Sequence, residues 1–281
     1  MPFQTDQLPT PPVAVVSDIH ANSAAFGVAI RQLHHLRNTR GVQNIVVLGD
    51  LFTYGCGPRR VVEQLLELAD DFDVWLVIGN HDEWYFDALA DDDDDPTADK
   101  PGWIRECIHW TRRRLDATGF DQVDDRRLWH RELVLGDVLL SHANPFGAGD
   151  WTYLNDEATR RKACEVLAER QLRAGIFGHT HRRLAAHIGE ESHLESFDDL
   201  VAPHREFTLQ SPTWLLNPGS VGQPREQRPM ATFMILWGDR RRLTADFRAI
   251  EVGVDEQIDA VRRADLTAGT KQRLIGYITG S

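Results

Sequence analysis

Residues 13–20 have the sequence VAVVSDIH, an apolar and mostly β-branched run that ends in an aspartate and a histidine. The run predicts a short buried strand. Asp18 and His20 are alternate residues, so in an extended chain both side chains would point to one side. The two could therefore hold one metal ion together, directly after the strand.

The chain after this motif alternates between helix and strand. Apolar runs at residues 45–48 and 74–78 predict two further strands, and the segments 23–36 and 58–68 predict helices between them. This alternation is typical of a parallel sheet with crossover helices. The carboxyl ends of such strands meet at one edge, where ligands and metals bind.

Candidate metal ligands follow every strand of this kind. Glycine-aspartate follows the second strand, and the sequence GNHD follows the third. Two later apolar runs end in SH at residues 141–142 and in GHTH at residues 178–181. The predicted metal ligands are Asp18, His20, Asp50, Asn80, His142, His179 and His181. Oxygen and nitrogen ligands without a thiolate suit Mn, Fe or Zn, and seven ligands suffice for two ions that share a carboxylate.

Two neighbours of these ligands are predicted to act in catalysis. Two metal ions can polarise a phosphoryl group and activate a water for in-line attack, so no serine or cysteine nucleophile is needed. His81 is placed to protonate the leaving oxygen or to stabilise the transition-state charge. Asp82 could orient the His81 imidazole and keep it protonated.

The rest of the chain is predicted as part of one domain, residues 1–281, with a flexible tail at residues 1–12. Residues 83–130 are predicted as a small helical cap that contains a helix at 103–115 and a solvated acidic run at 91–95. Further predictions are a strand at 133–140, a helix at 157–170, a loop or irregular hairpin at 189–210, strands at 213–216, 231–237 and 243–250, and a terminal helix at 256–278.

The composition of the chain limits the classes of function that we expect for the protein. The chain has 281 residues, 42% of them hydrophobic, and no apolar run near the ~20 residues that span a bilayer. Its three widely spaced cysteines indicate neither a disulfide framework nor a thiolate site, and its amino-terminus does not resemble a signal peptide, so we expect a cytoplasmic protein. A formal charge of −12 argues against long nucleic acid as a partner, but bound metals would still attract a small phosphoester.

These motifs resemble the calcineurin-like metallophosphoesterase superfamily, whose pattern is D-x-H, G-D, G-N-H-D/E, H and G-H-x-H. The resemblance covers roughly residues 13–237. Tyr54-Gly55 with Pro58, Trp151 with Tyr153, and the sequence NPGSVGQPR at 217–225 are similar to a bacterial and archaeal branch labelled diadenosine-tetraphosphatase-like or YfcE-like. The implied fold is four-layered and α/β, with a central β-sandwich flanked by helices.

The resemblance also implies how the ligands are shared between two metal ions. The first metal would take Asp18, His20, Asp50 and His181, and the second would take Asp50, Asn80, His142 and His179. We expect two divalent ions, Mn first, with Fe, Zn or Ni as alternatives. Asn22 and Arg225 are predicted to contact substrate, the arginine through a phosphate, with a structural salt bridge as the alternative role of the arginine.

The predicted function is hydrolysis of a small phosphomonoester or phosphodiester, including a nucleotide, by metal-activated water. One alternative is a phosphoprotein phosphatase, which needs an open groove. Another is a nuclease on short oligonucleotides, which the acidic charge disfavours. A non-catalytic binding protein would show lost ligands, and none is lost. The oligomeric state stays open.

Overall fold

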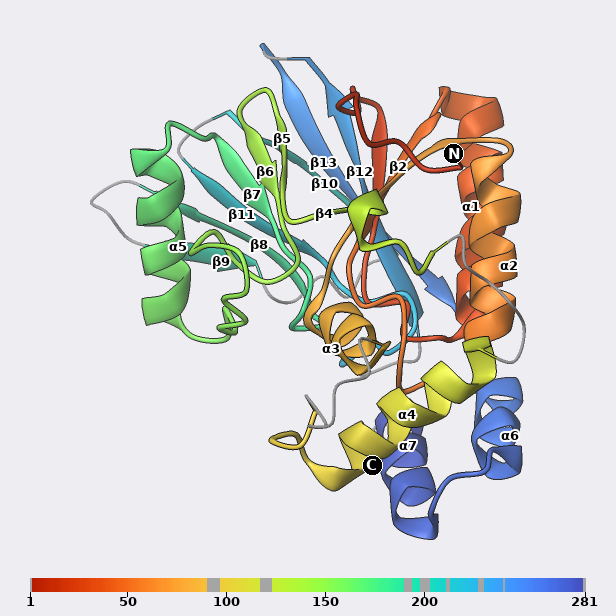
Figure 1. Cartoon of the computed structure of the whole chain (residues 1–281). Helices are drawn as coiled ribbons and strands as arrows, with labels where there is room; N and C mark the ends of the chain where they lie inside the picture. The colour runs from red at the N-terminus through yellow and green to blue at the C-terminus, as the bar shows by residue number, and fades with distance from the viewer. Residues whose placement is uncertain are drawn as a thin grey trace.

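The structure is a computed structural model that describes residues 2–89, 97–116, 123–189, 194–197, 203–210, 213–226, 230–239 and 241–279. The acidic run predicted at 91–95 and part of the segment predicted at 189–210 lie outside these residues. Two β-sheets stand face to face, with helices on both outer sides (Figure 1). The predicted helix-flanked β-sandwich is therefore confirmed.

The first sheet is mixed. In the described residues it has seven strands, in the order β10 (His204–Thr208), β13 (Leu243–Glu251), β12 (Met230–Gly238), β1 (Val13–Val16), β2 (Asn44–Leu48), β3 (Asp73–Val77) and β4 (Trp129–His130). The four strands from β1 to β4 run parallel, as the strand-helix alternation predicts. The strands β12, β13 and β10 continue the sheet in antiparallel pairs.

The second sheet is also mixed and shorter-stranded. Among the described residues its order is β5 (Leu133–Leu135), β6 (Val138–Leu140), β7 (Ala174–Ile176), β11 (Trp214–Pro218), β8 (Arg183–Ile188) and β9 (Leu194–Phe197). Strands β6, β7 and β11 are parallel neighbours. The carboxyl ends of β6 and β7 carry the last two ligand motifs, so both sheets supply one site.

Helices cover the two outer faces. On one side of the sandwich lie α1 (Ser23–Arg40) and α2 (Pro58–Ala69), and on the other lies α5 (Glu157–Glu169) (Figure 1). Between β3 and β4 the chain forms α3 (Asn80–Leu89), α4 (Gly102–Asp116) and the short 3-10 helix Arg126–Leu128. The chain ends with α6 (Asp255–Arg263) and α7 (Ala268–Thr279), which lie beside α4 (Figure 1).

The strands are uniformly apolar because both of their faces are covered. Alternate side chains of a strand point to opposite faces. In β1, Val13 and Val15 join the core between the sheets, whereas Ala14 and Val16 join the core under α1 and α2. A third cluster, which includes Leu167 of α5, fills the space between α5 and the second sheet. Burial on both faces explains why the sequence reads as continuous hydrophobic runs.

The segment predicted as one strand at 133–140 is a hairpin. Gly136 has a φ of 65°, a left-handed conformation that glycine adopts without strain, and it separates the antiparallel strands β5 and β6. The terminal helix predicted at 256–278 is likewise divided into α6 and α7. Thr267, in the connection between them, donates its backbone N–H and its hydroxyl to the Glu106 carboxylate of α4.

Two other segments differ from the predictions. Residues 189–210 contain β9 and β10, which pair with different sheets and do not form a hairpin with each other. Residues 2–12 are not a free tail. Phe3 is buried in the core, and the Gln4 backbone N–H donates to Val74 O at 2.9 Å. Among the described residues, no helix has both the length and the apolar character needed to span a bilayer.

Candidate metal centre

The predicted ligands come together at the carboxyl ends of five strands. Asp18 and His20 follow β1, Asp50 follows β2, Asn80 begins α3 just after β3, His142 follows β6, and His179 and His181 follow β7. All seven side chains are buried. Five of these residues have positive φ values: Asp18, His20, Asp50, His179 and His181. Such strained backbone persists only where the surrounding structure enforces it, and it is typical of functional sites.

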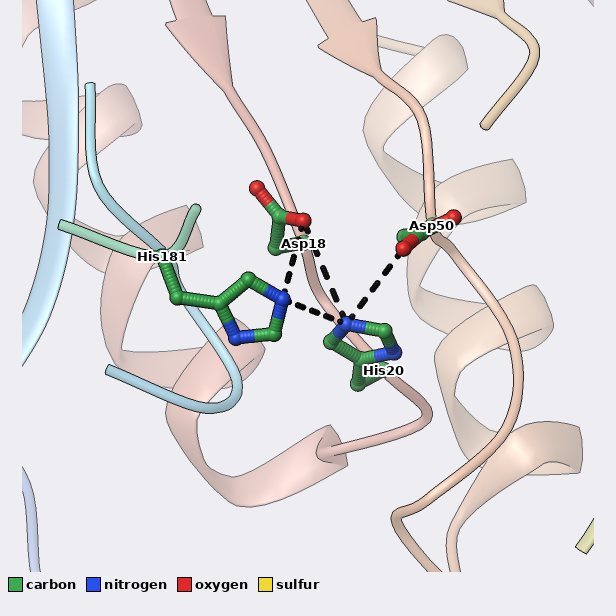
Figure 2. A group of neighbouring side chains, drawn as sticks. All are labelled: Asp18, His20, Asp50 and His181. Carbon is green, nitrogen blue, oxygen red and sulfur yellow. Dashed lines mark hydrogen bonds and ion pairs between the residues drawn. The ribbon is translucent and has the colours of Figure 1, made fainter. Parts of the chain in front are cut away.

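One group of ligands lies around Asp18 and His20. The His181 Nε2 atom is 3.1 Å from His20 Nε2 and 3.3 Å from Asp18 Oδ1, and His20 Nε2 is 3.6 Å from Asp50 Oδ2. Figure 2 shows these four side chains converging from three loops. The set equals the first ligand set that the family resemblance implies.

A second group shares Asp50 with the first. His142 Nε2 lies 3.3 Å from Asp50 Oδ2, and ligand atoms of Asp50, His142 and His179 all lie within 4.8 Å of one another. The same Asp50 oxygen therefore adjoins a histidine of each group. This arrangement suits a carboxylate shared between two ions, as predicted.

Unsatisfied buried atoms show that these residues fit metal ions. Asp18 Oδ1, Asn80 Oδ1 and His142 Nε2 are buried and have no hydrogen-bond partner. A buried polar atom without a partner is costly, so native structures leave few of them. Three of the seven predicted ligands carry such atoms, and oxygen and imidazole nitrogen are the donors that divalent metals take.

The remaining histidine nitrogens are held by backbone carbonyls. His142 Nδ1–H donates to Leu48 O at 2.8 Å, His181 Nδ1–H to Gln223 O at 2.8 Å, and His20 Nδ1–H to Phe52 O at 3.2 Å. His179 uses its other nitrogen, Nε2, toward Trp151 O at 3.0 Å. Second contacts of this kind fix the ring and the tautomer of a metal-binding histidine.

The charges of the site favour the binding of cations. Burial would raise the pKa of Asp18, but nearby His181 and His142 outweigh burial and lower that pKa to about 2. Burial would lower the pKa of His142, but the negative charge of Asp50 outweighs burial and raises that pKa to about 10. The carboxylates that favour a proton on His142 would equally favour a metal ion there.

His81 and Asp82 do not interact as predicted. The Thr53 hydroxyl lies 2.7 Å from His81 Nδ1, and burial lowers the pKa of His81 to about 4. Asp82 instead accepts hydrogen bonds from the backbone N–H groups of Asp50, Leu51, Phe52 and Gly79. Its carboxylate satisfies the turn after β2, so it neither orients the His81 imidazole nor keeps it protonated.

The two predicted substrate contacts occupy different surroundings. Asn22 caps α1 by accepting from the Ala25 N–H at 3.1 Å, and its amide donates to Gly222 O at 2.8 Å. Asn22 therefore has a structural role, and its contact with substrate stays a prediction. The Arg225 backbone N–H donates to His181 O at 3.1 Å, which places this residue next to a ligand.

Some residues of the site were not singled out in the sequence. Ser17 donates its hydroxyl to Asp18 Oδ2 at 2.6 Å, and Thr53 contacts His81. Each lies within three positions of a motif residue, and that proximity is the only sequence signal for them. Tyr277 lies in α7, far beyond the last motif, and only the fold brings it close.

A separate acidic cluster does not join the centre. His204, Glu206 and Asp246 could hold an ion by distance alone. However, Arg248 donates to both Asp246 oxygens, at 2.8 and 2.6 Å, and His204 Nε2 is 2.9 Å from the same carboxylate. The guanidinium of Arg248 therefore neutralises Asp246, the buried carboxylate of this cluster.

Known proteins resemble this chain over nearly its whole length. An uncharacterized protein of Methanocaldococcus jannaschii, MJ0912, is 28% identical over 264 residues, which cover 93% of this chain and 96% of that protein. A metallophosphoesterase from Sphaerobacter thermophilus is similar in structure, with a TM-score of 0.69, 26% identity, and coverage of 94% of this chain and 97% of its own.

The hypothetical protein PH1004 from Pyrococcus horikoshii OT3 shares the fold, with a TM-score of 0.73 at 17% identity, covering 96% of this chain and 98% of its own. The profile of the calcineurin-like phosphoesterase superfamily domain matches residues 12–240. The chain therefore belongs to the calcineurin-like phosphoesterase superfamily, a family of metal-dependent phosphoric ester hydrolases.

Proposed function

We propose that this protein hydrolyses a small phosphomonoester or phosphodiester at a centre of two divalent metal ions, Mn first among the candidates. The observation that supports it best is the position of Asp50 Oδ2, 3.6 Å from His20 Nε2 and 3.3 Å from His142 Nε2. Bound ions would supply a polarised phosphoryl group and an activated water for in-line attack.

The chain's own residues have distinct tasks in this proposal. Asp18, His20 and His181 would hold one ion, Asn80, His142 and His179 would hold the other, and the Asp50 carboxylate would contribute to both. With its low pKa, His81 is neutral at neutral pH, and its Nδ1 faces the Thr53 hydroxyl. Its Nε2–H would then donate a hydrogen bond to a phosphoryl or leaving oxygen, which stabilises charge in the transition state.

The three thiols of the chain are poorly suited to a covalent route. Burial raises the pKa of Cys56 to about 11, and those of Cys107 and Cys164 to about 12. At neutral pH these three residues, the only cysteines of the chain, are protonated and poorly nucleophilic. The proposed nucleophile is therefore a metal-activated water rather than a thiolate.

The test is hydrolysis of p-nitrophenyl phosphate and bis(p-nitrophenyl) phosphate by metal-stripped protein, with and without added Mn. We expect Mn-dependent turnover that Asp50→Asn abolishes. Glu206→Gln is the matched control, because Glu206 is a half-exposed carboxylate of the separate cluster on β10. Two bound metals without turnover of either ester, a phosphopeptide or a short oligonucleotide would refute the proposal. Faster turnover of the phosphopeptide would favour the phosphatase alternative, and faster turnover of the oligonucleotide would favour the nuclease alternative.

A further inference from the structure

Exposed aromatic side chains gather at the metal centre. Among the described residues, the large hydrophobic side chains that are exposed are Leu8, Tyr153 and Tyr277, the tyrosines at 42% and 37%. A single exposed hydrophobic residue is ordinary on a protein surface. Two tyrosines from distant parts of the chain at one site are a more informative feature.

Tyr153 lies directly on a metal ligand. It belongs to the segment between β6 and α5, and its ring stacks on that of His179, with centroids 3.9 Å apart and planes at 21°. One face of the tyrosine covers the ligand, and 42% of the residue stays exposed to solvent. Tyr153 therefore forms part of the wall of the metal centre.

Tyr277 approaches the centre from the carboxyl-terminal helices. Its ring is 5.8 Å from Trp103 of α4 and 6.3 Å from Tyr54. The Tyr54 ring is in turn 4.5 Å from that of His81. A small core that includes Tyr54, Cys107, Val261 and Leu274 fixes α7 beside the loop that contains Tyr54. The position of Tyr277 is thus built into the fold.

Arg225 connects these aromatic residues to the charge of the site. Its guanidinium carbon is 5.9 Å from the Tyr277 ring centroid, and its charge opposes the burial that raises the pKa of Tyr153. In the described part of the chain Arg225 has no carboxylate partner, and its Nε is buried without a hydrogen bond. An unneutralised arginine at this point fits a phosphate and also offers a flat surface for stacking.

The cavity next to His20 has no room for a large group. A cavity lined by His20, Tyr54, Gln257 and Leu274 offers about 10 Å³ to a water-sized sphere, roughly the space that one buried water needs. The part of a substrate beyond its phosphate does not fit in this cavity, and the exposed rings of Tyr153 and Tyr277 offer it another surface.

We propose that Tyr153, Tyr277 and Arg225 form a subsite for a planar aromatic group carried by the phosphoester, with the arginine near the phosphate. The inference rests on the proposed function, because the phosphate is assigned to the metal centre. Nucleobases and simple arenes share this chemistry, since both present a π-face to a tyrosine ring or a guanidinium plane.

The test uses phosphonates, whose carbon–phosphorus bond resists hydrolysis, so that binding is measured apart from turnover. Benzylphosphonate and cyclohexylmethylphosphonate differ in having a flat or a puckered ring of similar size. Adenosine and ribose 5′-phosphonates differ in the base. Calorimetric titration of the Mn-loaded protein gives each dissociation constant, and we expect the aromatic member of at least one pair to bind about 10-fold tighter. The pair with the larger ratio distinguishes arene from nucleobase.

The variants Tyr277→Leu and Tyr153→Leu remove a ring, and Tyr277→Phe and Tyr153→Phe keep it. The aromatic preference is the ratio of the two dissociation constants within a pair. We expect this ratio to fall toward 1 when the tyrosine that contacts the ligand ring is replaced by leucine, and to persist when the same tyrosine is replaced by phenylalanine. Thermal unfolding and Mn content show whether each variant is folded and loaded.

Equal binding within both pairs by the unaltered protein would overturn the subsite, as would a preference that survives both leucine substitutions. Hydrolysis of bis(p-nitrophenyl) phosphate, measured in parallel, tests the proposed function separately. If the protein hydrolyses an ester but shows no preference for aromatic ligands, only the subsite proposal is refuted. If it prefers aromatic ligands but hydrolyses no ester, only the hydrolase mechanism is refuted.

Discussion

The carboxylate of Asp82 accepts a hydrogen bond from the backbone N–H of Asp50 over 2.7 Å. The same side chain also accepts from Leu51, Phe52 and Gly79, at 2.9, 3.3 and 3.0 Å. Asp82 is fully buried and stabilises the turn that presents Asp50 to both ligand groups. Its position in the motif thus serves the geometry of a metal ligand.

The substitution Asp82→Asn should therefore damage the centre through its scaffold. The substituted side chain would turn an NH₂ group toward backbone donors, and we expect a loss of roughly 3 kcal/mol in the free energy of unfolding. Mn affinity should fall together with stability, as measured by denaturant unfolding and metal titration. Full stability and metal content with lost turnover would instead indicate a direct catalytic role for Asp82.

The shared carboxylate predicts different metal losses for different ligand variants. Asp50→Asn should weaken both sites, because Asp50 Oδ2 adjoins both ligand groups. His142→Ala should leave one ion bound, since His142 belongs to the second group only. The metal content per chain, measured by plasma mass spectrometry after dialysis, should approach zero ions in Asp50→Asn and one ion in His142→Ala. Equal contents in the two variants would argue against a shared ligand.

The hydrogen bond between Thr53 and His81 predicts a positioning role for Thr53. His81→Ala should retain both metals and lower kcat by about 10²- to 10⁴-fold. Thr53→Val removes the hydroxyl from Nδ1, and we expect a smaller fall, about 10-fold, without loss of metal. Thr53→Ser, which keeps a hydroxyl, should restore kcat and the wild-type pH profile. A valine variant with unaltered kcat would show that Thr53 only fills space.

Metal binding should become tighter as pH rises. Burial lowers the pKa of His142, but the charge of Asp50 overcomes this and raises it to about 10. Below that pH the metal-free protein holds a proton on His142 that a metal must displace, so affinity should rise up to about tenfold per pH unit for this proton. Calorimetry at pH 8 in two buffers of different ionisation enthalpy should detect proton release. Affinity that is flat with pH would contradict this.

A glycine next to the ligands predicts a steric effect. A Cβ at Gly79 would overlap the Asp50 carboxylate, whereas one at Gly102, at the start of α4, would meet no atom within 4 Å. Gly79→Ala should displace Asp50 and reduce Mn affinity by about tenfold or more. Gly102→Ala is the matched control and should bind Mn normally in the same titration. Similar affinity in both variants would mean that the turn adapts.

Local patterns in the sequence were enough to identify the candidate ligands and to predict the parallel part of the fold. Asp18 and Asp50 follow buried runs, and the rule that parallel strands end at one edge puts them together. The hairpin at 133–140 and the two helices at 255–279 were not predicted, because their breaks depend on Gly136 and on the contact of Thr267 with Glu106.

The sequence by itself determined the candidate metal ligands, because they are coded by residue type within a few positions of each strand. Only the tertiary structure decided which side chains surround them. Asp82 bonds to a turn some thirty residues earlier, and Tyr277 reaches the site because α7 packs on α4 and the Tyr54 loop. Such contacts join segments far apart in the chain, and their register follows from packing of the whole core, so no local pattern records them.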